Sequence, residues 1–411
     1  MPALFAIFNI FALLYLVRGV QILVKIGREW KPLHQEPLTR AKKHLADQAS
    51  FFIAVPPGVI VHEFFHALAT WLVGGQIVDY GYGLFWGYVV PVGDFTAGQD
   101  WFIALAGTIG SLLYGAAIWL AFRRSKASSF RCFGLRAFRF QIYFALLYYP
   151  VLTIFIAGTG ISDWLTIYNF RLTPILSGVT AVTHITLLYL FWRADREGHF
   201  EAPAFETVAA QEKFRELERK TAVQSQNAPL QFRYIDTLWR GGAKHKAKYK
   251  AQQYLRENPN SATGWLLLAQ MESEKQVSKK ARQNVEKALQ LGLADAKQAA
   301  SADVLLGRYA LERNQAADAV NYFSQAIATA VPSRDSLSQP PHELLFYARL
   351  YHWRSQAYRR QNQYGPAEQD IQQAIQFAQM SNSQNAAAYC QNEQKVIQHH
   401  ANQAQHAHSN I

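Results

Sequence analysis

The residues best suited to chemistry lie close together in an apolar stretch, where His62, Glu63 and His66 form a His-Glu-x-x-His pattern. Residues four apart on a helix share one face, so both imidazoles can reach the same metal ion, and Zn2+ readily accepts imidazole nitrogen. Glu63 lies beside them, where its carboxylate can take a proton from an attacking water. The spacing predicts two metal ligands and a general base on one helix.

A third ligand must come from elsewhere in the chain, because catalytic zinc is held by three protein ligands and keeps one open position. Asp163 is the first candidate, since Gly158 and Gly160 can break the preceding helix and let the carboxylate turn inward. His184 is its rival. Three further carboxylates lie in a loop that water can reach, and they rank lower: Asp79, Asp94 and Asp100.

Five apolar segments surround these residues, and each approaches or exceeds the roughly 20 residues that a helix needs to cross a bilayer. They cover 4–26, 51–72, 101–122, 140–157 and 175–192. Ionisable side chains inside a spanning helix are costly unless they are paired or coordinated. The His-Glu-x-x-His pattern in the second segment is therefore expected to be functional, although a polar cluster satisfied across the bundle is the alternative.

Basic residues cluster after the first and third apolar segments, at 28–43 and 123–136, and none lies within 74–100. By the positive-inside rule the N-terminus is outside, and everything from Arg193 onward is cytoplasmic. The formal charge of +12 thus reflects membrane topology, and no nucleic-acid partner is expected. The two cysteines, Cys132 and Cys390, cannot build a disulfide framework.

The loop at 74–100 alternates glycine with aromatic residues, which is typical of a re-entrant hairpin packed on the helices or of an aromatic belt at the membrane surface. A hairpin at 81–90 could bind an unwound substrate strand by edge pairing. In the third segment Gly107, Ser111 and Gly115 recur every four residues. This stripe would let another helix approach closely, unless these are ordinary small residues of a membrane helix.

The run HEFFHALATWLVGG at 62–75, the run AGTIGSLLYG at 106–115 and an Asp-Trp pair after a glycine break together resemble the site-2 protease class of intramembrane metalloproteases, the M50 peptidase family, and its M50B branch most closely. The resemblance extends to about residue 190. It implies that His62, His66 and Asp163 bind Zn2+ and that Glu63 is the catalytic base. This chain lacks the Asn-x-x-Pro of better-known members, and Trp164 replaces the glycine of their Leu-Asp-Gly.

The remainder of the chain carries an internal repeat. Small, bulky and small residues recur at helical spacing, starting at Ala247, Ala281, Ala319 and Ala367, which are 34, 38 and 48 residues apart. The first period and its small and aromatic positions resemble the tetratricopeptide repeat (TPR), with insertions in the later units, the longest near 332–341. About four helix pairs are predicted, with a groove for a cytoplasmic peptide or protein partner, or else a plain helical prop for the membrane domain.

These observations predict an all-α chain, a polytopic bundle of about five transmembrane helices followed by a soluble α-solenoid of TPR-like pairs. The expected divisions are a metalloprotease domain at 1–195, a juxtamembrane linker at 196–229, repeats at 230–380 and a disordered tail at 381–411, whose histidines could alternatively bind metal weakly. The predicted function is zinc-dependent hydrolysis of membrane-protein substrates within the bilayer. The alternative is an inactive membrane-anchored TPR scaffold. A metalloprotease with a glutamate as third ligand is disfavoured, because Glu197 lies beyond the last segment.

Overall fold

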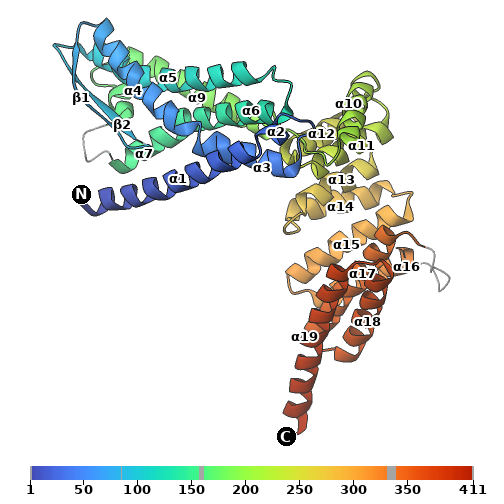
Figure 1. The fold of residues 1–411 in the computed structure, drawn as a ribbon. Coiled ribbons are helices and arrows are strands. Elements are labelled where there is room, and N and C mark those ends of the chain that lie inside the picture. The colour runs from blue at the N-terminus through green and yellow to red at the C-terminus, as the bar shows by residue number, and fades with distance from the viewer. Residues whose placement is uncertain (1, 85, 157–161, 331–338, 410–411) are drawn as a thin grey trace. The chain divides into compact units, whose positions relative to one another are not determined.

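The computed structural model describes residues 2–84, 86–156, 162–330 and 339–409. The chain divides into two compact units, Met1–Tyr249 and Lys250–Ile411, and the boundary falls inside α12 (Lys244–Glu257). Helices dominate both units (Figure 1), and the hairpin is the only sheet within the described ranges. The predicted all-α class is therefore confirmed.

The N-terminal unit is a set of helices interrupted once by a β-hairpin. In chain order its elements are α1 (Pro2–Arg28), α2 (Trp30–Leu33), α3 (Arg40–Phe52), α4 (Val55–Leu72), β1 (Gln76–Tyr82), β2 (Gly87–Val92), α5 (Ala97–Phe122), α6 (Ser128–Tyr143), the π-helix η1 (Phe144–Tyr148), α7 (Tyr149–Ile156), α8 (Asp163–Ile167), α9 (Pro174–Arg196), α10 (Val208–Val223) and α11 (Ala228–Arg240).

Three helical segments of the described chain are long and apolar enough to cross a membrane: Arg40–Leu72, Ala97–Phe122 and Pro174–Arg196. They contain the second, third and fifth predicted spans. The predicted spans at 4–26 and 140–157 lie in α1 and in the run from α6 to α7, and they stay predictions. Residue 157 lies outside the described part of the chain.

Local sequence explains where the two central helices begin. The prolines of α4 occupy its first turn, where the missing N–H has no helical partner to lose. A capping box starts α5: the Thr96 hydroxyl accepts from the Gln99 amide, and the Gln99 side chain accepts from the Thr96 amide.

Small residues on α5 allow close packing against both neighbours. A methyl group at Gly110 would lie 2.5 Å from Phe65 Cγ of α4, and one at Gly115 would lie 2.6 Å from Gln141 Cβ of α6. Neither position could hold a side chain without moving the adjacent helix. Gly115 belongs to the predicted stripe of Gly107, Ser111 and Gly115, and Gly110 adds a close approach that lies beside that stripe.

The aromatic loop contains an antiparallel hairpin. Gln76 pairs with Val92 at its open end and Tyr82 with Gly87 near its turn, with an irregularity between Ile77 and Asp79. Both strands contact α4. The loop therefore forms a hairpin packed on α4, and its entry into a membrane stays a prediction.

Residues 196–229, predicted to be a linker, belong to the N-terminal unit. The Phe205 amide donates to the Leu38 carbonyl at 2.8 Å, and the Gln211 side chain donates to the Glu36 carboxylate at 2.9 Å. These hydrogen bonds tie the segment to the connection between α2 and α3, and the unit boundary falls later than the predicted boundary at 229/230.

The C-terminal unit consists of packed helix pairs. It contains the end of α12, then α13 (Ala262–Glu272), α14 (Lys279–Leu291), α15 (Ala296–Glu312), α16 (Ala316–Ala330), α17 (Pro341–Arg360), α18 (Tyr364–Met380) and α19 (Gln384–Ser409). Each of α13, α15 and α17 packs on the helix that follows it.

The repeat positions identified in the sequence form the core of these pairs. Six alanines at the small positions of α14, α16 and α18 are fully buried: Ala281, Ala288, Ala319, Ala326, Ala367 and Ala374. A larger side chain there would separate the paired helices. The predicted packed helix pairs, with small residues at the predicted positions, are confirmed. Most of the predicted long insertion near 332–341 lies outside the described residues.

The prediction of a disordered tail at 381–411 differs from the structure, which has α19 over most of it. Ala387, Cys390 and Ile397 are buried, and the last two pack with Ile371 and Ala374 of α18. These three apolar residues share one helix face despite the surrounding Gln and Asn. These few apolar residues suffice to dock α19, because they pack on the apolar face of α18 that includes Ile371 and Ala374.

Candidate metal centre

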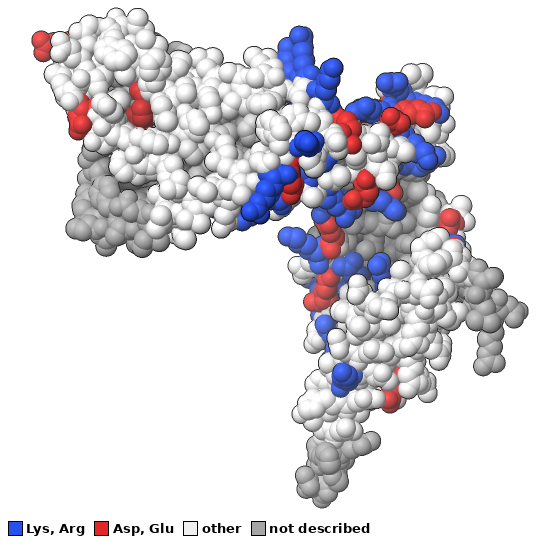
Figure 2. Space-filling model, in the orientation of Figure 1, with Lys and Arg blue, Asp and Glu red and all other residues white. Residues whose placement is uncertain are grey.

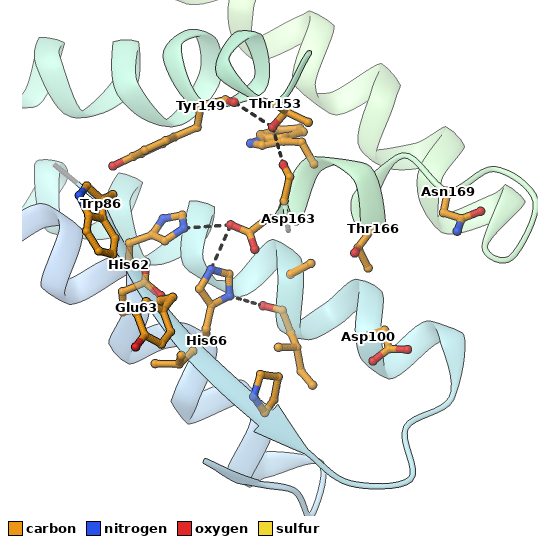
Figure 3. A pocket seen from close by; sticks show the side chains of 18 of the residues that line it. His62, Glu63, His66, Trp86, Asp100, Tyr149, Thr153, Asp163, Thr166 and Asn169 are labelled. Carbon is orange, nitrogen blue, oxygen red and sulfur yellow. Dashed lines mark hydrogen bonds and ion pairs between the residues drawn. The ribbon is translucent and has the colours of Figure 1, made fainter. Parts of the chain in front are cut away.

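Three side chains of types that can ligate a metal, from two distant parts of the chain, meet in the N-terminal unit (Figure 3). Asp163 Oδ2 lies 3.1 Å from His62 Nε2 and 3.2 Å from His66 Nε2. One donor atom from each residue lies within 4.8 Å of the other two, and both histidines are buried. The residues reach this point because α4 presents both histidines on one face and α8 begins with the aspartate.

The outer nitrogens of both imidazoles have partners on α5. His66 Nδ1 lies 2.7 Å from the Ile103 carbonyl. Since a carbonyl only accepts, Nδ1 carries a proton, and in the neutral ring Nε2 keeps the lone pair that a metal ion would take. His62 Nδ1 lies 3.1 Å from Ser111 Oγ. Such contacts fix the tautomer and ring orientation of metal-binding histidines.

The backbone of α5 passes directly against the donor atoms. A methyl group at Gly107 would lie 2.3 Å from His66 Nε2 and 2.7 Å from His62 Nε2. Only glycine leaves room for both imidazoles at this turn of the helix. Gly107, predicted as a packing residue, therefore borders the cluster itself.

A cavity of about 470 Å³ opens beside the cluster. Its size is in the range of small-molecule and peptide sites. Glu63 lines it, and strand β2 runs along the same wall, where a methyl group at Gly87 would lie 2.5 Å from Glu63 Cγ. The Tyr149 ring, 5.3 Å from the His62 ring, forms part of the opposite side.

The donor set fits a catalytic zinc ion. Two imidazole nitrogens and one carboxylate oxygen are a known ligand combination for zinc enzymes, and the cavity leaves one side of the cluster open. The partners on α5 supply the outer contacts that metal-bound histidines normally have. No other group of three such residues is found within the described ranges.

The structure brings together all four predicted site residues and leaves the rival ligands elsewhere. Both ring nitrogens of His184 are engaged, with the Tyr168 hydroxyl at 2.5 Å and the Leu146 carbonyl at 2.7 Å. Asp79 accepts from Tyr88. Asp100 lines the far end of the cavity, outside the three-residue cluster, and Asp94 is exposed. The predicted glycine break at Gly158 and Gly160 lies outside the described residues.

Sequence reasoning did not find the roles of Ser111, Ile103 and Tyr149. Ser111 was identified only as a small residue of the stripe. The spacing of four between Gly107 and Ser111 could have indicated this role, because it places both residues on the face of α5 that contacts the histidines of α4. The Ile103 contact uses a backbone carbonyl, which no residue type reveals, and nothing in the sequence marks Tyr149.

No protein-family model matches this chain, and no curated protein matches it. Among solved structures, the chain is similar to MamA, with a TM-score of 0.29 and 15% identity over 44% of this chain and 94% of that chain. It is also similar to YrrB, described as a TPR protein with an unusual peptide-binding site, with a TM-score of 0.30 and 14% identity over 47% of this chain and 97% of that one. The resemblance to the site-2 protease class stays a prediction.

Proposed function

We propose that this protein is an intramembrane zinc metalloprotease. The observation that carries the proposal is the meeting of His62, His66 and Asp163 beside Glu63 at the wall of an open cavity. A polar cluster kept only for stability would not need a base and a cavity next to it. Zinc is the metal that this set of ligands suits best.

The three cluster residues would hold the ion, which when bound polarises a peptide carbonyl and makes water a better nucleophile near neutral pH. Glu63 would take the proton from the attacking water and pass it to the leaving nitrogen. Ser111 and the Ile103 carbonyl would keep the His62 and His66 rings oriented through contacts with their outer nitrogens. The walls formed by β2 and α7 would limit the access of bulk water.

Membrane embedding is supported by exposed apolar surface. Large apolar side chains on α9 point away from the protein, including Ile175 at 79% exposure and Val182 at 67%. Such a surface is unfavourable in water and favourable in lipid. Three helices of spanning length agree with this placement.

Charge gives the proposed orientation. On the face drawn in Figure 2, the hairpin end of the N-terminal unit carries acidic side chains and no Lys or Arg, and basic side chains gather at its other end. Two helices end there with a Trp followed by an Arg whose guanidinium lies over its ring, Trp119 with Arg123 at 5.4 Å and Trp192 with Arg196 at 5.1 Å. This pattern is typical of a cytoplasmic membrane interface, so the C-terminal unit would be cytoplasmic.

The substrate would be a membrane protein whose spanning helix unwinds locally, because a helix hides its peptide bonds. Strand β2 borders the cavity at Gly87, close to Glu63, and could align an extended segment by backbone pairing. The TPR-like helix pairs would recruit the substrate or a partner protein on the cytoplasmic side.

A second candidate function is a membrane-anchored scaffold without catalysis. It is favoured by the helix pairs of the C-terminal unit, an architecture suited to binding peptides or proteins, and by the absence of the Asn-x-x-Pro segment. In this case the cluster would be a remnant of an enzyme.

The two candidates are separated by reconstituting wild-type protein and Glu63→Gln in vesicles with a fluorogenic membrane-spanning peptide. The proposed protease should cleave the peptide, and Glu63→Gln should keep its zinc while cleavage falls by about 10²- to 10⁴-fold. If zinc-loaded wild-type protein cleaves a panel of such peptides no faster than Glu63→Gln does, the result would favour the scaffold.

A further inference from the structure

His184 lies buried in the middle of α9 with both ring nitrogens engaged. Its Nε2 is 2.7 Å from the Leu146 carbonyl, and its Nδ1 is 2.5 Å from the Tyr168 hydroxyl. The carbonyl can only accept, so Nε2 carries a proton and donates it. In neutral His184, Nδ1 then accepts from the Tyr168 hydroxyl. A histidine bonded in this way has no lone pair left for a metal.

The contact with Leu146 lies where a proline interrupts the hydrogen bonds of the preceding helix. In an α-helix the Leu146 carbonyl would accept from residue 150, but that residue is Pro150 and has no N–H. The chain forms a π-helix here, η1, before α7 begins. His184 donates to this carbonyl, to which Pro150 cannot donate, and so ties α9 to η1.

The contact with Tyr168 ties the same side chain to α8, the five-residue helix that begins with Asp163. Tyr168 directly follows the last residue of α8. At the other end Trp164 packs its ring against the imidazole, with centroids 4.6 Å apart. Trp164 is buried and its Nε1 has no hydrogen-bond partner among the described residues, so packing alone holds it. His184 therefore contacts residues at both ends of α8.

We propose that His184 is a positioning residue for Asp163. It fastens α8 to the π-helix and to α9, so that the carboxylate arrives beside His62 and His66 in a fixed place. A helix of five residues has too few internal hydrogen bonds to hold that position alone. The inference rests on the proposed function, because it assumes that Asp163 serves as a metal ligand.

The test is the zinc affinity of the detergent-purified full chain, measured by competition with a chromophoric chelator. His184→Ala should lower the affinity about 10- to 100-fold, the usual effect of losing an outer contact of a metal site. Tyr168→Phe, which removes one hydroxyl, should lower it in the same direction. The effects of the two changes should be less than additive when combined, since they share one hydrogen bond.

Two conservative variants divide the role of His184. His184→Asn keeps an acceptor near the position of Nδ1 for Tyr168, and His184→Gln keeps a donor near the position of Nε2 for Leu146. We expect His184→Asn to recover more zinc affinity than His184→Gln, because the Tyr168 bond leads to Asp163. The visible spectrum of the Co2+-loaded protein should change in His184→Ala and return toward wild type in His184→Asn.

Thr180→Ala is the matched control. This residue is also buried on α9, but its hydroxyl bonds only the Leu176 carbonyl of the same helix. Wild-type zinc affinity in both His184→Ala and Tyr168→Phe, or an equal loss in Thr180→Ala, would overturn the positioning role and leave the metal site intact. Wild-type protein that binds no zinc would overturn the metal site and this inference together.

Discussion

Asp163 Oδ2 lies 3.1 Å from His62 Nε2, although 101 residues separate the two in the chain. The acidic residue of α4, Glu63, lines the same cavity but lies outside the cluster of His62, His66 and Asp163. The carboxylate ligand on α8 and the base on α4 therefore come from different elements. This separation lets metal binding and proton transfer be disturbed one at a time.

Replacing Ser111 with alanine should weaken zinc binding about 10-fold, because His62 Nδ1 loses the hydroxyl that orients the ring. The chelator-competition assay measures this change. Thr108→Ala is the control: its hydroxyl is also buried on α5, but it has no hydrogen-bond partner among the described residues. Equal zinc affinities in the two variants would mean that Ser111 does not support His62.

Gly107→Ala should displace both imidazoles, since the added methyl group would lie 2.3 Å from His66 Nε2 and 2.7 Å from His62 Nε2. We expect zinc affinity to fall at least about 10-fold. Gly98→Ala, on the same helix, meets its nearest atom at 3.7 Å and should bind zinc normally. Normal zinc binding by Gly107→Ala would show that the histidines have more space than the structure allows.

Asp303 gives the C-terminal unit a pH dependence. Burial raises the pKa of this carboxyl to about 6 in the folded protein, above the ordinary value of about 3.9 expected when unfolded. The folded state therefore holds the proton more tightly, and the free energy of unfolding should fall as pH rises from about 4 to about 6. The loss should be on the order of 1–2 kcal/mol, after allowance for partial exposure of the side chain.

Asp303→Asn removes the titrating group and should raise the melting temperature more at pH 7.5 than at pH 4.5. The measurement is thermal unfolding of the full chain at both pH values, followed through protease resistance of the C-terminal unit. The control is Asp318→Asn, at an exposed position of α16. Asp295→Asn is not used, because Asp295 caps α15. If the melting temperature of Asp303→Asn changes between pH 4.5 and pH 7.5 as much as that of wild type does, the prediction is wrong.

The sequence predicts the half of the site that depends on local geometry. His62, Glu63 and His66 lie within five residues of one helix, so their relative placement follows from helical periodicity alone. The contacts with Ser111 and Ile103 depend on how α5 packs on α4. No spacing within one element can reveal them.

Asp163 and His184 illustrate what the sequence left open. Both residue types bind zinc, and both lie in or next to apolar segments. Pro150 could have separated them as candidate ligands, because it cannot donate to the Leu146 carbonyl, and His184 donates to that carbonyl instead of binding a metal. Recognising this requires knowing that α9 lies beside η1, which is a property of the tertiary fold.

The repeats were predictable because alanine at a helix crossing is nearly a geometric requirement, as the fully buried Ala281 and Ala319 illustrate. The tail was predicted as disordered because Gln, Asn and His dominate its composition. Cys390 and Ile397 are too few to signal a helix, yet they are enough to dock one onto α18. Composition reports average polarity, whereas docking depends on a few positions.

The central claim is tested most directly by zinc content in detergent-purified protein, comparing wild type with His66→Ala, Asp163→Ala and Asp100→Ala. Asp100 lines the same cavity but lies outside the cluster, so it controls for general changes there. We predict about one zinc ion per chain in wild type and Asp100→Ala, and loss of zinc in the other two. Wild-type protein without zinc after reconstitution, or full zinc content in Asp163→Ala, would contradict the account.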